Sequence, residues 1–138
     1  MRPAFQILTI LSILCLNTNV QAASPQGDFN KLRTEASEAV IIEVTLVVIV
    51  QDSPVNKTSQ YITIHAKVLG VERSKSGLKV GDTITINYSI PTNPLPGYSS
   101  IPILDNRSVY PAFLNRQEKV FAPAANGSSF TMTPKSGK

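Results

Sequence analysis

The sequence predicts a small, mainly β domain: a Greek-key barrel of five or six short strands with a short N-terminal helix. Two observations lead to this prediction. Residues 40–50 are rich in β-branched side chains, and residues 61–71 and 83–88 alternate strictly between apolar and polar side chains, which is the period of a half-buried strand. Several short strands separated by turn residues favour a barrel or a sandwich, because closing the sheet hides its edges.

The first 22 residues have the features of a cleaved signal peptide. Arg2 supplies a positive start, residues 5–16 are largely apolar, and residues 20–22 read Val-Gln-Ala, a small-residue cleavage site. The apolar run is shorter than the roughly 20 residues of a membrane span. Cys15 follows a leucine, whereas a lipid-modified cysteine follows a small residue. We therefore expect cleavage after residue 22, or 23, and a secreted or periplasmic protein.

Removal of 22 residues from 138 leaves 116, and we expect one domain over residues 23–133 with a disordered tail at 134–138. The only cysteine leaves with the signal, so the remaining chain forms no disulfide, which favours a bacterial compartment. Twelve basic and nine acidic side chains then remain, a net charge of +3. The basic residues are scattered, which argues against nucleic-acid binding, and no segment predicts stable membrane insertion after cleavage.

The short helix is expected over Phe29–Ser37. Phe29, Leu32 and Ala36 recur at helical spacing, and Asp28 is placed to cap the first free amides. We expect this helix to pack across one opening or edge of the barrel.

The run Val40–Val50 predicts a central strand, because Val, Ile and Thr favour the pleated sheet. Continuous alternation would place one set of side chains on one face, and Glu43 and Thr45 on the other. The predicted apolar face consists of Ile42, Val44, Leu46, Val48 and Val50.

Two further strands are predicted to pair antiparallel over Tyr61–Val71 and Thr83–Tyr88. Alternation directs one set of side chains inward: Ile62, Ile64, Ala66, Val68, Ile84, Ile86 and Tyr88. It directs Tyr61, Thr63, His65 and Lys67 outward. We expect a turn over residues 74–77, and Asp82 to fix a second turn by bonding its own backbone.

Four prolines between Ile90 and Asp105 predict a long loop, because proline cannot donate to a strand ladder. Shorter strands follow over Ser108–Leu114 and Val120–Ala122, and residues 130–133 are expected to add a last edge strand. Loops of this length in compact domains are often functional.

This order of parts resembles a group of secreted bacterial proteins with a barrel like that of the oligonucleotide/oligosaccharide-binding (OB) fold, distantly similar to the inhibitory domain of tissue inhibitors of metalloproteinases. The resemblance is carried by residues 38–44, 66–70, 78–86 and 113–114 and covers residues 29–132. It implies an OB-like fold and an extracytoplasmic compartment. It does not imply protease inhibition, because the inhibitors insert a cysteine-led N-terminus that this chain lacks.

Candidate chemical groups are few. His65 is the only histidine, which excludes sites that need two; it is a ligand contact, a pH-sensitive group or an exposed strand residue. Glu43 interrupts an apolar strand and marks either a functional site or the solvent face. We expect no catalytic residues, no metal site and no cofactor.

Tyr98, Tyr110 and the prolines around them form the best recognition candidate, since aromatics on a restricted backbone give contact area at low entropy cost. The alternative is that this loop only caps the barrel. The sequence thus predicts a non-enzymatic binding or accessory module for an envelope or extracellular protein or saccharide, with Tyr98, Tyr110, His65 and Glu43 as binding candidates. The alternatives are a structural or protease-inhibitor-like envelope protein, or an envelope hydrolase that uses Glu43, Asp82 or His65.

Overall fold

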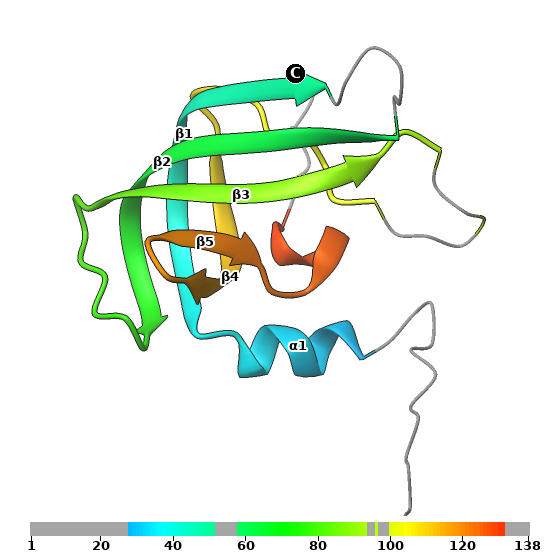
Figure 1. Cartoon of the computed structure of the whole chain (residues 1–138). Helices are drawn as coiled ribbons and strands as arrows, with labels where there is room; N and C mark the ends of the chain where they lie inside the picture. The colour runs from blue at the N-terminus through cyan, green and yellow to red at the C-terminus, as the bar shows by residue number, and fades with distance from the viewer. Residues whose placement is uncertain (1–27, 52–57, 94–95, 97–99, 132–138) are drawn as a thin grey trace, which may run out of the picture.

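The computed structural model describes residues 28–51, 58–93, 96 and 100–131 as a closed five-stranded barrel (Figure 1). Around the barrel the strands follow the order β1-β2-β3-β5-β4, and β4 pairs with β1 to close it. All pairs are antiparallel except a single parallel bridge between β3 and β5. The elements are α1 (Phe29–Glu35), β1 (Glu38–Gln51), β2 (Ser59–Ser74), β3 (Thr83–Pro91), β4 (Val109–Gln117), β5 (Val120–Pro123) and the 3-10 helix η1 (Asn126–Ser129).

This architecture confirms the predicted small, mainly β, OB-like barrel with one short helix. The predicted signal peptide and the predicted C-terminal tail lie outside the described residues. Within those residues, no helix combines the length and the apolar character needed to cross a membrane.

The alternation predicted for β2 and β3 is confirmed. The two strands pair antiparallel from Ser59↔Pro91 to Lys67↔Thr83. Every second β2 residue from Ile62 to Val68 is buried, while Tyr61 is 51% exposed. Because side chains in a strand point alternately to the two faces, this register leaves one face of the β2–β3 pair in the core and the other in solvent.

The predicted single apolar face of β1 is wrong beyond Val44. Val44 pairs with Ala66 but Leu46 pairs with His65, so Thr45 is an extra residue in a β-bulge. The Thr45 hydroxyl donates a hydrogen bond to the His65 carbonyl, at 2.9 Å. One inserted residue exchanges the two faces of the strand that follows, so Leu46 and the even-numbered residues after it point outward.

The core fills the inside of the barrel and draws on every strand. Its buried members are Val40, Ile42, Val44, Ile62, Ile64, Ala66, Val68, Ile84, Ile86, Ile101, Leu104, Tyr110, Ala112, Leu114, Phe121 and Phe130. Ile101, Leu104 and Phe130 come from outside the named strands. They pack with the strand residues in the same buried cluster.

The predicted strand boundaries need three corrections in the C-terminal half. β4 continues past Leu114 to Gln117 and pairs there with β5. β3 continues past Tyr88 to Pro91, which lies opposite Ser59. The bonds between β2 and β3 use the even-numbered β2 residues, and the next one joins the Thr92 amide to the Thr58 carbonyl at 3.0 Å, so the ladder needs no donor from Pro91. The predicted strand over residues 130–133 is a single bridge, Ala112↔Phe130, that follows η1; residues 132 and 133 lie outside the described residues.

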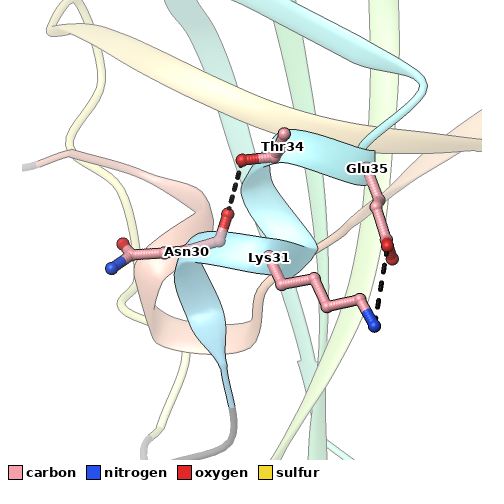
Figure 2. A network of polar contacts seen from close by, with 4 residues as sticks. All are labelled: Asn30, Lys31, Thr34 and Glu35. Carbon is pink, nitrogen blue, oxygen red and sulfur yellow. Dashed lines mark hydrogen bonds and ion pairs between the residues drawn. The ribbon is translucent and has the colours of Figure 1, made fainter.

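Helix α1 lies next to the start of β1 and contacts η1 (Figure 1). Its own polar contacts are local: Lys31 pairs with Glu35 at 3.8 Å, and the Thr34 hydroxyl donates to the Asn30 carbonyl at 2.8 Å (Figure 2). Asp28 occupies the N-cap position, but its side chain makes no capping hydrogen bond, so the predicted cap is wrong.

Two arginine side chains, Arg33 and Arg73, hold α1 against the barrel, and we call them the clamp. The Arg33 guanidinium lies 4.5 Å from the centroid of the Phe113 ring. Arg73 donates from its guanidinium to the Ala36 carbonyl at 3.1 Å and to the Arg33 carbonyl at 3.0 Å. The end of α1 is therefore fixed by a cation–π contact and by charge-assisted bonds to its last carbonyls.

Two turns are stabilised by carboxylates. Glu38 is fully buried; its carboxylate accepts hydrogen bonds from the Ser74 hydroxyl and, at 3.2 Å, from the Ser76 amide. The Asp82 carboxylate accepts the Lys79 amide at 2.8 Å, as predicted for a turn residue. Gly81 beside it has a φ of 97°, a conformation that favours glycine.

Candidate functional site

The outer face of β2 and β3 gathers polar and aromatic side chains in two columns. In an antiparallel pair, residues directly opposite each other project from the same face of the sheet. The register therefore places three pairs side by side on the outer face: Tyr61↔Ser89, Thr63↔Asn87 and His65↔Thr85. We call these six residues the β2–β3 face.

A shallow depression of about 320 Å³ lies at one end of the β2–β3 face. Its lining includes Tyr61, Thr63, Asn87 and Ser89. Tyr61, Asn87 and Ser89 are exposed, and Thr63 is half-buried. These four side chains thus offer one aromatic ring with its hydroxyl, two further hydroxyl groups and one amide to a ligand, all of them uncharged.

His65 occupies the other end of this face. It is half-buried, and its Nδ1 lies 3.2 Å from the Thr85 hydroxyl oxygen. This contact engages Nδ1 and leaves Nε2 as the second hydrogen-bonding atom of the imidazole.

Glu43 lies beyond His65 on the same outer side of the barrel. It is half-buried and opposite Lys67 on β2 and Val109 on β4. The structure therefore brings two predicted site residues, His65 and Glu43, to one side of the barrel, near Lys67 and outside the depression.

Tyr110 is not a surface residue. Only 5% of it is exposed, and its hydroxyl oxygen accepts the Asp105 amide at 3.1 Å. Its position on β4, in step with the buried Ala112, directs the ring into the core. Tyr110 therefore offers no ring surface to a ligand. Tyr98 lies outside the described residues.

Residues 100–105, the described end of the predicted recognition loop, cap the barrel. Ile101 and Leu104 are buried in the core. The Tyr88 hydroxyl donates to the Pro102 carbonyl at 2.7 Å. Burial raises the pKa of Tyr88 well above its ordinary value, and the nearby Tyr110 adds to this shift. Of the two roles considered for the loop, these contacts favour capping for residues 100–105.

No hydrogen bond or ion pair joins the three groups considered for hydrolysis, Glu43, Asp82 and His65. The Asp82 carboxylate bonds the backbone of its own turn, and His65 contacts Thr85. Among the described ranges, no group of three or more His, Cys, Asp or Glu side chains is arranged to hold a metal ion.

The sequence analysis did not name the outward polar residues of β3 as site candidates. Thr85, Asn87 and Ser89 follow from the same alternation that assigned Ile84 and Ile86 to the core. Pairing those outward positions with Tyr61 required the register, which the turn between the strands determines and the alternation does not.

A second depression, of about 270 Å³, lies beside α1 and is lined in part by Arg33, Arg73 and Phe113. The two guanidinium groups are engaged in the clamp that holds α1. The residues of this depression are therefore explained by the packing of the helix.

Comparisons with protein-family models, with curated proteins and with solved structures found no significant match.

Proposed function

We propose that this chain is an exported, non-enzymatic binding module that recognises a neutral saccharide on the β2–β3 face. The observation that supports this most is the composition of the depression, where Tyr61 lies beside Thr63, Asn87 and Ser89. Hydroxyl and amide groups donate and accept hydrogen bonds in the way that sugar hydroxyls require, and an exposed aromatic ring supplies apolar contact area with a polar tip.

The charge of the face distinguishes a saccharide from an oligonucleotide. OB folds use the face of strands 2 and 3 for both ligand classes, but nucleic-acid binding needs cations that follow the phosphates. The four outward side chains that line the depression include no Lys or Arg, and Lys67 lies on the same outer side only beyond His65, opposite Thr83. The use of this face in OB folds is an analogy of fold; the neutral polar lining is the argument specific to this chain.

The compartment is inferred from the sequence. A signal peptide over residues 1–22 would deliver the domain to the envelope or the exterior, where polysaccharides are abundant. The protein would then act as an accessory module that holds a saccharide without changing it.

The experiment is a screen of the purified protein on an array of neutral oligosaccharides, followed by calorimetry with the best ligand. We expect Tyr61→Ala and Asn87→Ala each to weaken binding by about tenfold or more, since each removes a central contact. Tyr61→Phe should retain most of the affinity, because the ring is kept.

Asn30→Ala is the matched control, because Asn30 is an exposed asparagine on α1, away from the β2–β3 face. It should bind like the unmodified protein, and all variants should melt at similar temperatures. Binding that is unaffected by both Tyr61→Ala and Asn87→Ala would refute the site. Binding only to a protein ligand would refute the saccharide assignment.

A further inference from the structure

Among the residues that the structure describes, the second half of β1 has one edge that pairs with no strand. β4 pairs with β1 only from Glu38 to Glu43, and the last contacts on that side join Val44 to Ser108 and Arg107. From Leu46 to Gln51, β1 pairs with β2 on one side, and no strand of the described chain pairs with it on the other. Figure 1 shows this part of β1 beside β2 at the top of the view.

The hydrogen-bond pattern identifies the free backbone groups. Val68 bonds toward the β3 side, through its amide and its carbonyl. Because the bonding direction alternates along a strand, the odd-numbered β2 residues bond toward β1. Val48 and Val50 lie opposite Thr63 and Tyr61 and so bond to β2. The amides and carbonyls of Val47, Ile49 and Gln51 therefore point away from β2, to the open edge.

This edge is apolar on both faces of the strand. Leu46 is 48% exposed, Val48 39% and Val50 56% on the outer face, and Ile49 is 46% exposed on the inner face. Strand edges of soluble proteins are normally protected by Lys, Pro or a covering segment. Residues 46–50 read Leu-Val-Val-Ile-Val, with neither charge nor proline.

We propose that this edge pairs with the same edge of a second copy of the chain, as an antiparallel β1–β1 ladder centred on Ile49. A two-fold axis at Ile49 places Val47 opposite Gln51 of the other copy, and Val48 opposite Val50. All the free backbone groups then find partners, in up to about six hydrogen bonds.

The absence of charge and the exposed apolar area both favour a second copy of the chain as the partner of the β1 edge. An antiparallel pair of this strand places no like charges opposite each other, because residues 44–51 are all uncharged. The exposed apolar side chains supply roughly 350–500 Å² per copy, at the low end for a specific interface. We therefore expect a reversible dimer that forms in the micromolar range. The C-terminal residues 132–138 are a poor alternative occupant by sequence, since they contain Pro134 and Gly137.

The dimer has a geometric consequence for the β2–β3 face. Directly opposite residues share a face of the sheet, so both copies present their β2–β3 faces on the same side of one continuous sheet. The two β2 strands are three strand spacings apart, about 14–15 Å. The dimer would be bivalent toward a repeating ligand, although the dimer itself does not depend on the proposed function.

Sedimentation velocity of the purified protein from about 1 to 200 μM tests the proposal. We expect a concentration-dependent shift from monomer to dimer, lost in Ile49→Lys, which places two like charges opposite each other. Val80→Lys is the matched control, because Val80 is 66% exposed and distant in sequence from the β1 edge; it should dimerise normally. Ile49→Pro gives an independent check, since it removes an amide that points away from β2.

Oxidation of the Ile49→Cys variant, with Cys15 replaced by Ser, tests the register. Paired residues at a two-fold axis lie about 5.5 Å apart between Cα atoms, within the range of a disulfide. We expect a cross-linked dimer with Ile49→Cys and none with Val80→Cys. A protein that is monomeric throughout, a dimer unaffected by Ile49→Lys and Ile49→Pro, or failure to cross-link would overturn the proposal. Any of these results would leave the saccharide site untouched, since Ile49 is not part of the β2–β3 face.

Discussion

Two tyrosines show how strand parity decides the role of a side chain. Tyr110 lies on an inward position of β4 and binds the Asp105 amide from inside the barrel. Tyr61 lies on an outward position of β2 and is half exposed. An aromatic residue near prolines suggested recognition by Tyr110, but alternation with the buried Ala112 outweighs that local composition. The same alternation makes Tyr61 the aromatic residue of the candidate site.

The raised pKa of Tyr88 leads us to expect that the folded protein loses stability in alkaline solution. This pKa is raised above the ordinary 10.0 by burial and by Tyr110, so folding favours the protonated phenol. The stabilisation that the buried, protonated phenol contributes is complete below about pH 10, the ordinary pKa of tyrosine. It is lost as the pH rises from there toward the raised pKa of Tyr88 in the folded protein.

We therefore expect the free energy of unfolding, measured by urea denaturation between about pH 8 and 11, to fall less steeply above pH 10 in Tyr88→Phe than in the unmodified protein. At neutral pH the variant should be less stable by about 1 kcal/mol, since the Pro102 carbonyl loses its donor. Parallel curves for the two proteins above pH 10 would contradict the assignment.

At the scale of elements, the inward faces of β2 and β3 were predictable, whereas the strand β1 was predicted but its inward face only as far as Val44. β2 and β3 alternate between apolar and polar side chains, so their inward positions follow from the sequence. The residues next to Thr45 in β1 are apolar on both sides, so the alternation of apolar and polar side chains does not reveal that one residue is extra. The bulge is visible only in the register with β2, and it converts a predicted core strand into a strand with an exposed apolar half.

The turn before β3 gives a prediction at this scale. Gly81 has a φ of 97°, and a Cβ added there would meet no atom within 4 Å, so Gly81→Ala should destabilise the protein by about 1 kcal/mol through backbone strain alone. In Gly70→Ala the added Cβ would lie 3.3 Å from Ile41 Cδ1, the mobile end of an exposed side chain. Thermal unfolding should rank Gly81→Ala below Gly70→Ala; the reverse order would contradict a role for the φ angle.

At the scale of the whole molecule, the barrel accounts for most of the sequence. The core, the capping loop residues 100–105 and the clamp on α1 each have a structural explanation. Two surfaces remain: the β2–β3 face and the open edge of β1. The fold class and the outward direction of His65 were predictable from periodicity. The composition of the face was not, because it depends on which β3 residues lie opposite Tyr61 and Thr63.

The most direct test of a saccharide site on the β2–β3 face is an NMR titration. The backbone amide signals of the isotopically labelled protein are followed while a neutral oligosaccharide selected on the array is added. We predict that the largest shifts fall on residues 61–65 and 85–89, the two strands of the β2–β3 face. Shifts concentrated on α1 or on residues 100–105, or none at saturating ligand, would contradict the proposed saccharide site.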